Sequence, residues 1–348
     1  MGMIQIPKQS IEYFKKHQDI IFESGVLAEG PWNYKLSEYV KTLTGATNAL
    51  PTNSNGSGMV ALLSVYRYIH NRRIVMIQSN TMYGVKAMVT AAGCSLKGFI
   101  QSQLETLMPS LGDVKNAIVP LSRGEKDSLV ILLSHIGGII NPEIEAIAAL
   151  CKKENIILLE DCAHSFSATL NGKHSGLFGN AGVYSFYATK AIPVGEGGVV
   201  VTNDNSLGNI IEKYSIYDRF DQIQEIGNNI RISEVQALLT YSIVKEWKTI
   251  INNKQVIAAL YITACEEAGI DFIDQSSNGQ LGNYYKFVIY NKKKTIQIAL
   301  PQLSKTTSPV YDYSIGTTNN VANYHACLPI WYGQDMKNTL EVIEELQK

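Results

Sequence analysis

The stretch GVYSFYATKAIPVGEGGVVVT, residues 182–202, contains two apolar runs that are typical of buried strands. The segment between them carries one lysine, Lys190, and the glycines of GEGG at 195–198. A lysine between two buried strands is either an ordinary solvated loop residue or an amine that holds a ligand, and glycines let the backbone come close to such a ligand. The stretch therefore predicts a hairpin whose loop carries a candidate functional amine.

Three further apolar runs are typical of buried strands, at 73–80, 128–135 and 155–164. Segments with helical periodicity alternate with such runs from about residue 50 to residue 205, and Pro142 stands at the start of one of them. This alternation predicts an α/β fold with a mostly parallel sheet.

Polar residues stand at the carboxyl ends of the predicted strands. In an open α/β sheet these ends share one edge, and ligands bind there. We therefore expect the following side chains to lie on one rim, where a site forms: Ser79, Asn80, His135, Asp161 and His164.

The rest of the chain predicts a second, smaller unit. Apolar spacing typical of one long helix runs over 232–270, and the chain then returns to two runs that we interpret as strands, at 284–291 and 295–303. A chain of 348 residues is long for one compact core. We expect a large domain over 1–245 and a smaller C-terminal α/β domain over 246–348.

Composition excludes several classes of protein. The formal net charge is −1, which gives no electrostatic footprint for nucleic acid or an anionic membrane, and no apolar stretch is long enough for a transmembrane helix. The five cysteines are widely spread and form no CxxC pair. They predict reduced thiols in a cytoplasmic protein and argue against a zinc site, so we expect no metal.

A loop rich in Ser, Asn and Gly precedes a predicted helix in TNSNGSGMVALLSVYRYIH, residues 52–70. Free N–H groups at a helix start, with small residues around them, form an anion site that suits a phosphate. The same composition is also typical of a plain helix cap. This loop alone does not decide between the two interpretations.

Asp161 and His164 follow an apolar strand, where each could have a purely structural role. A buried carboxylate normally has a cationic partner. Together with Lys190 and the phosphate loop, however, the two residues complete the set of groups that binds pyridoxal 5'-phosphate (PLP). The lysine would form the Schiff base, the aspartate would keep the pyridine nitrogen protonated, and the loop would bind the phosphate.

The segment EDCAHSFSATLNGKHSGLFGNAGVYSFYATKAIPVGEGGVVVTND, residues 160–204, resembles the core signature of the DegT/DnrJ/EryC1/StrS family of sugar aminotransferases. The similarity continues in LAEGPWNYKLSEYVKTLTGA at 27–46, NGSGMVAL at 55–62, GNNIRISEVQALL at 227–239 and LPIWYGQD at 328–335. This resemblance implies the fold type I of PLP-dependent transferases, in which a large PLP-binding domain with a mostly parallel mixed sheet is joined to a smaller C-terminal α/β domain.

The resemblance also implies the role of each matching residue. Lys190 would form the Schiff base and then act as general acid and base, Asp161 would pair with the pyridine nitrogen, and His164 would lie near the cofactor's phenolic oxygen. The phosphate would be bound by Gly56, Ser57 and Ser185. Asn229 and Arg231 would reach the site of a partner subunit, which implies a homodimer with shared active sites. Where the family often has an aromatic residue stacked on the ring, this chain has Met82, with Tyr83 adjacent.

The implied reaction is a transamination. L-glutamate would be the amino donor, pyridoxamine phosphate (PMP) the intermediate form of the cofactor, and a keto sugar linked to a nucleotide the acceptor, as in amino-sugar biosynthesis. Two alternatives remain open: a PLP- or PMP-dependent sugar dehydratase, and a catalytically idle sensor that binds the cofactor or a nucleotide sugar. Related dehydratases carry a histidine at the position of Lys190, which counts against the first. The segment from about 265 to 325 matches the family poorly and would help to shape the acceptor pocket.

Overall fold

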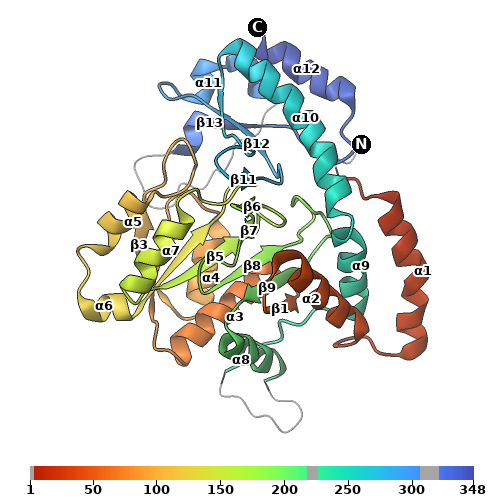
Figure 1. Ribbon diagram of the computed structural model, residues 1–348, viewed down its shortest axis with the longest axis vertical. Helices are drawn as coiled ribbons and strands as arrows, with labels where there is room; N and C mark the ends of the chain where they lie inside the picture. The colour runs from red at the N-terminus through yellow and green to blue at the C-terminus, as the bar shows by residue number, and fades with distance from the viewer. Residues whose placement is uncertain (1–3, 218–225, 306–320) are drawn as a thin grey trace.

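A seven-stranded sheet forms the centre of the molecule, with the strand order β1-β9-β8-β5-β4-β2-β3 (Figure 1). The computed structural model describes residues 4–217, 226–305 and 321–348. Strands β8, β5, β4, β2 and β3 are mutually parallel, and β9 is antiparallel to both of its neighbours. The strands are β1 Asn48–Thr52, β2 Ile74–Gln78, β3 Ser95–Ile100, β4 Leu129–Ser134, β5 Ile157–Cys162, β8 Ala181–Ser185 and β9 Gly198–Thr202. The predicted α/β fold with a mostly parallel mixed sheet is confirmed.

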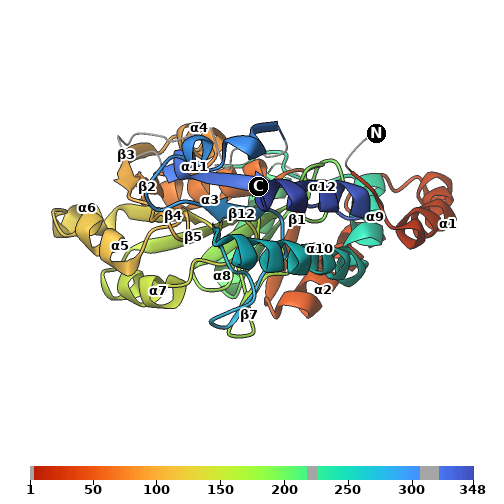
Figure 2. The same ribbon diagram turned by 90° about the horizontal axis from the view of Figure 1, so that it is seen from above.

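Helices cover both faces of this sheet (Figure 2). Successive strand residues point to opposite faces, and the sequence supplies apolar residues for both. In β4, Val130 and Leu132 pack in one core with the helices α3 (Asn55–Tyr68) and α4 (Tyr83–Ala91). Ile131 and Leu133 pack in another core with α5 (Leu111–Ile118) and α7 (Ile144–Lys153). Every residue of β4 is buried, as expected of a parallel strand covered on both sides.

The helices and a second, smaller sheet complete this part of the chain. The helices of the N-terminal and central parts are α1 Lys8–Ser24, α2 Pro31–Thr44, α3 Asn55–Tyr68, α4 Tyr83–Ala91, α5 Leu111–Ile118, α6 Arg123–Asp127, α7 Ile144–Lys153, α8 Asn205–Ile216 and α9 Glu234–Val244. A second, three-stranded sheet, in the order β11-β6-β7, is formed by β6 Thr169–Leu170, β7 Lys173–His174 and β11 Gln280–Leu281.

The C-terminal part has its own three-stranded sheet and core. Its elements are α10 Trp247–Ala268, β10 Asp271–Phe272, β12 Phe287–Tyr290, α11 Ile296–Ala299, the 3-10 helices Pro301–Lys305 and Val321–Tyr324, β13 His325–Leu328 and α12 Met336–Leu346. Figure 1 shows this part beyond one end of the large sheet, with α10 running back towards α9. We propose a domain boundary at the turn between α9 and α10, which matches the expected division into 1–245 and 246–348.

Two predictions about this region are wrong. The long helix over 232–270 is divided into α9 and α10, because the chain turns at Lys245 and Glu246. Ile243, Val244 and Ile250 lie in the same core on both sides of the turn, so the apolar spacing continues through it. The run at 295–303 forms short helices rather than a strand. So short an apolar run does not distinguish a strand from a helix.

A buried carboxylate joins the N-terminal helices to α9. Glu234, the first residue of α9, accepts hydrogen bonds from the backbone N–H groups of Gly30, Trp32 and Asn33 at 3.0, 2.8 and 3.0 Å. These are free donors at the start of α2, which a carboxylate stabilises both as an acceptor and as a charge. Among the described residues, no helix is long and apolar enough to cross a membrane.

Candidate active site

Lys190 lies in the loop that joins β8 to β9, as predicted. Its backbone N–H donates to the carbonyl of Tyr187 at 2.9 Å, which closes a tight turn. Gly195 and Gly197 have φ angles of 132° and 138°, a region that side-chain-bearing residues rarely adopt, and the loop is held by a bridge between Tyr187 and Gly195. The glycine cluster therefore gives this loop a fixed shape.

The amine of Lys190 is poised near its neutral form. Burial lowers the pKa of Lys190 to about 8, the carboxylate of Asp161 opposes this change, and the charge of Lys286 adds to it. The uncharged fraction of this amine is therefore much larger near neutrality than that of an ordinary lysine, and it increases further as the pH rises through about 8, as a nucleophile or general base requires.

Asp161 is held rigidly at the end of β5. The side chain is 7% exposed, and its Oδ1 accepts hydrogen bonds from the Asn55 side-chain amide and the Ala163 N–H, both at 3.1 Å. The Ser134 hydroxyl donates its one proton to Oδ2 of Asp161 at 3.2 Å. The Thr81 hydroxyl, 2.8 Å from the Ser134 hydroxyl, is therefore the donor in the contact between these two residues. This network stabilises the carboxylate and fixes its orientation.

His164 is buried beside the same loop and packs against Tyr285. The two ring centroids are 4.3 Å apart, with an angle of 36° between the planes. Burial lowers the pKa of His164 well below its usual value, and the charges of Lys190 and Lys286 lower it further. The ring is therefore neutral at physiological pH.

A small hollow brings Lys190, Asp161 and His164 together. Its volume is about 20 Å³, and it is lined by Thr81, Met82, Ser134, His135, Ile136, Asp161, Ala163, His164 and Lys190. Of the two residues considered for stacking on a ring, Met82 lines the hollow, whereas Tyr83 begins α4, is 57% exposed and does not line it.

The predicted phosphate loop forms the start of α3. Ser54 caps the helix and accepts a hydrogen bond from the N–H of Ser57 at 3.1 Å. The Ser57 hydroxyl lies near the side-chain oxygen of Asn53, at 2.5 Å, and the carbonyl of Ser54, at 2.9 Å. Gly56 is in the first turn, so it shares the free N–H groups of the helix start.

A close backbone contact connects this helix start to Ser185. A Cβ atom at Gly198 would lie only 2.7 Å from the backbone nitrogen of Asn55, so a larger residue would push β9 away from α3. Gly198 pairs in register with Ser185, the last residue of β8. The three residues predicted to bind one phosphate therefore lie along the same edge of the large sheet: Gly56, Ser57 and Ser185.

Asn229 and Arg231 do not line the hollow around Lys190 of their own chain. The Asn229 carbonyl accepts a hydrogen bond from the Asn53 side chain at 3.3 Å. The Arg231 guanidinium donates to the Ser215 carbonyl and lies 3.7 Å from a carboxylate oxygen of Glu29. Asn229 thus lies beside the predicted phosphate loop, and Arg231 lines a separate cavity with Glu29 and Ser215.

Of the residues predicted on the rim, Ser79 and Asn80 do not line the hollow. The Ser79 hydroxyl accepts a hydrogen bond from the backbone of Ser102 at 3.0 Å, and the Asn80 amide donates to the Leu107 carbonyl at 3.2 Å. Both side chains are buried in these structural contacts.

His135 is held by Glu160 rather than free to react. Because its Nδ1 accepts the Asn141 N–H at 3.1 Å, its Nε2 carries the proton and donates to Glu160 at 2.8 Å. The Glu160 carboxylate also accepts backbone N–H groups from Gly176, Phe178 and Gly179. His135, Glu160 and Cys162 lie at metal-ligand spacing. The polar atoms of His135 and Glu160, however, form hydrogen bonds to each other and to the backbone of Asn141 and of 176–179.

Sequence reasoning missed Asn55, Thr81, Ser134 and Tyr285. A signal for Thr81 and Ser134 is present, since both lie one residue from positions assigned to the rim. Asn55 lies in a stretch whose composition indicates only a phosphate loop. Tyr285 lies in an apolar run of the C-terminal part that carries no local sign of a site.

The arrangement of the chain matches that of solved aminotransferases. A DegT DnrJ EryC1 StrS aminotransferase from Brucella abortus has a TM-score of 0.87 at 16% identity, with 100% of this chain and 98% of that chain covered. PseC of Helicobacter pylori, an aminotransferase involved in the biosynthesis of pseudoaminic acid, has a TM-score of 0.84 at 19% identity, with 99% and 98% covered. This likeness confirms the predicted fold.

The family model described as the DegT/DnrJ/EryC1/StrS aminotransferase family matches residues 9–346. The chain therefore belongs to this family, as its sequence predicted. The chain is 30% identical over 174 residues to a GDP-perosamine synthase of Escherichia coli O157:H7, covering 47% of this chain and 44% of that relative. It is 25% identical over 251 residues to the UDP-4-amino-4,6-dideoxy-N-acetyl-beta-L-altrosamine transaminase of Helicobacter pylori (strain ATCC 700392 / 26695), covering 69% and 64%. The chain thus spans about half the length of these relatives.

Proposed function

We propose that this protein is a PLP-dependent aminotransferase that moves the amino group of L-glutamate to a keto sugar linked to a nucleotide. The observation that carries the proposal is the amine of Lys190, which shares one hollow with the buried carboxylate of Asp161. Membership of an aminotransferase family supports the reaction type. The names of the relatives, a GDP-perosamine synthase and a UDP-sugar transaminase, support the acceptor class.

The residues around the hollow fit PLP. Within the described part of the chain, Oδ2 of Asp161 has only the Ser134 hydroxyl as its hydrogen-bond partner, which leaves room for a protonated ring nitrogen. The start of α3 and Ser185 offer donors for a phosphate along the edge of the sheet that also carries Asp161. The hollow itself is smaller than the cofactor, but Met82 at its wall is 41% exposed and unbranched, so it can move aside.

When bound, PLP would supply an aldehyde that takes up amines and a ring that delocalises the electron pair left on a carbon after its proton is removed. Lys190 would hold the cofactor, and its freed Nζ would remove the proton from the α-carbon of the donor. The same Nζ would return a proton to the carbon that receives the amine. Asp161 would stabilise a positive charge on the pyridine nitrogen of the cofactor. The neutral ring of His164 would add no second positive charge that repels it.

Two absorption spectra of the purified protein with PLP, taken before and after L-glutamate is added, test this function. We expect a visible band from lysine-bound PLP that disappears with glutamate, and release of 2-oxoglutarate. Lys190→Ala should abolish the band, whereas Lys173→Ala, at an exposed lysine, should leave it unchanged.

The acceptor is tested by offering nucleotide-linked keto sugars to the glutamate-treated protein. Return of the visible band with formation of an amino sugar would support the proposal. A protein that binds PLP at Lys190 but never responds to glutamate would contradict the glutamate assignment. No band in the unsubstituted protein would contradict the enzyme function itself.

A further inference from the structure

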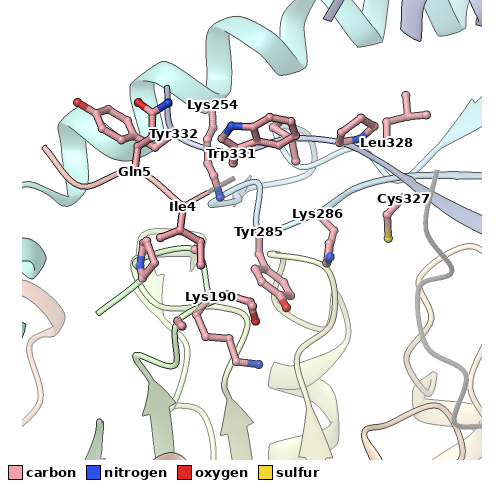
Figure 3. A pocket seen from close by; sticks show the side chains of 16 residues that line it. Ile4, Gln5, Lys190, Lys254, Tyr285, Lys286, Cys327, Leu328, Trp331 and Tyr332 are labelled. Carbon is pink, nitrogen blue, oxygen red and sulfur yellow. The ribbon is translucent and has the colours of Figure 1, made fainter. Parts of the chain in front are cut away.

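Lys190 also lines a larger cavity, between the loop after β8 and the C-terminal part of the chain (Figure 3). Its volume is about 400 Å³, the size of a site for a small organic ligand. Most of its wall is apolar, with Leu328, Trp331 and Ile4 among the lining residues. Its charged lining groups are three lysines, Lys190, Lys254 and Lys286, and none of its described lining residues is acidic.

Lys254 is the most unusual of these lysines. It comes from α10 and is only 4% exposed, and Figure 3 shows its amine directed towards the cavity. The amine donates a hydrogen bond to the Tyr284 carbonyl at 3.1 Å, and an ammonium group has three donors to offer. Burial, with the nearby charge of Lys286, lowers the pKa of Lys254 to about 7.

Lys286 and Lys190 both lie near the ring of Tyr285. Its amine lies 5.2 Å from the centroid of the Tyr285 ring, and the amine of Lys190 lies 5.3 Å from the same centroid. The backbone of Lys286 is fixed on both sides, by the carbonyl of Gly137 at 2.9 Å and the side-chain amide of Gln275 at 2.7 Å. No carboxylate in the described part of the chain forms an ion pair with Lys254 or Lys286.

Like charges gathered in an apolar cavity destabilise a fold, so their position calls for an anion that the protein itself does not supply. We propose that this cavity binds the amino donor, and that Lys254 and Lys286 hold its carboxylate groups beside Lys190. This inference rests on the proposed function, because it concerns the substrate of that same site.

The donor fits the cavity better than the nucleotide part of the acceptor. The side chains of Lys254 and Lys286 line the same cavity as Lys190, so an anion that they bind lies in the cavity that Lys190 also lines. In a dicarboxylic amino acid, one carboxylate is on the carbon that bears the amine, and the other is at the end of a short apolar chain. In a sugar nucleotide, the sugar ring separates the phosphates from the keto carbon.

Calorimetric titration of the PLP-loaded protein with glutarate tests the proposal. Glutarate carries both carboxylates but no amine, so it binds without reacting. We expect Lys254→Met and Lys286→Met each to raise the Kd for glutarate by about tenfold or more, since each removes a charged hydrogen-bond donor but keeps the apolar stem. Lys293→Met, at an exposed lysine outside the cavity, should leave the Kd unchanged.

Thermal unfolding distinguishes donor binding by Lys254 from a purely structural role of this lysine. Because the buried Tyr284 carbonyl loses its hydrogen-bond donor in Lys254→Met, Tm should fall in either case. If Lys254 binds the amino donor, added glutarate should raise the Tm of the unsubstituted protein clearly more than that of Lys254→Met, whereas a purely structural lysine would leave the two glutarate-dependent shifts equal. Wild-type glutarate affinity in folded, PLP-binding Lys254→Met and Lys286→Met proteins would overturn the proposal. A raised KM for the sugar acceptor with unchanged glutarate affinity would also overturn it. Failure of the proposed function would differ, because the unsubstituted protein would then show no visible band with PLP.

Discussion

Lys190 is the residue whose chemistry depends most on its surroundings. Its pKa of about 8 results from burial, which Asp161 opposes and Lys286 reinforces. The neutral fraction of this amine therefore increases as the pH rises through about 8. Below that pH the amine is mostly charged and cannot attack an aldehyde.

The rate at which the PLP-free protein combines with PLP should follow this titration. We expect the rate of formation of the visible band, measured by stopped-flow absorbance, to rise with pH and to level off above about 8. In Lys286→Met the midpoint should move to higher pH, because a positive neighbour has been removed. A midpoint that does not move in this variant would show that Lys286 does not influence Lys190.

The contacts of Asp161 predict a graded series of variants. Asp161→Asn removes the negative charge and should reduce the rate of the glutamate half-reaction by about a hundredfold or more. Ser134→Ala removes one hydrogen bond to the carboxylate and should cost about threefold to tenfold. Thr81→Val removes a hydrogen bond to Ser134, one contact further from the carboxylate, so its effect should be the smallest. Single-turnover rates with glutamate give the three values. Equal losses of rate in the three variants would contradict a hydrogen-bond chain that runs from Thr81 through Ser134 to Asp161.

At the scale of elements, strand alternation and helix starts explain most of the fold. Val130 and Leu132 serve one core and Ile131 and Leu133 the other, so β4 requires helices on both of its faces. The break between α9 and α10 positions a residue of the larger cavity. It directs α10 into the C-terminal part, where Lys254 meets the carbonyl of Tyr284.

Glu234 should be important for stability rather than catalysis. Glu234→Gln keeps the size of the side chain but removes the charge that accepts three backbone N–H groups at the start of α2. We expect a loss of about 1–3 kcal/mol in the free energy of unfolding, measured by urea titration. PLP binding to the folded protein should persist. Glu341→Gln, at an exposed position of α12, is the matched control and should change the stability little.

For the whole molecule, we propose a homodimer in which Asn229 and Arg231 serve the site of the partner subunit. The support within this chain is their position, since neither lines the hollow that contains Lys190. Arg231 is held by Ser215 and Glu29, so the segment that carries both residues is well anchored.

Mixing two inactive variants tests this assembly. Lys190→Ala and Asn229→Ala proteins, allowed to exchange subunits in equal amounts, should recover about a quarter of the wild-type activity, because half of the dimers then contain one intact site. Verified exchange without any recovery would contradict a shared site. Separate incubation of each variant is the control.

The sequence predicted the fold where the relevant signal is local. Short apolar runs mark the strands, and residues at their carboxyl ends lie on a common edge, so the neighbourhood of Lys190, Asp161 and His164 followed from 155–164 and 182–202. Residues 306–320, part of the segment expected to shape the acceptor pocket, lie outside the described residues.

Tertiary structure alone decided how these groups are surrounded. Asn55 reaches Asp161 from 106 residues away, and Lys254 and Lys286 enter the cavity beside Lys190 from the C-terminal part. No periodicity or spacing encodes such contacts, because they depend on how distant elements pack after each has formed. The sequence by itself thus determined the family, the sheet and the position of the candidate lysine. The fold determined the charge environment of that lysine, because burial and neighbouring charges exist only once the chain is folded.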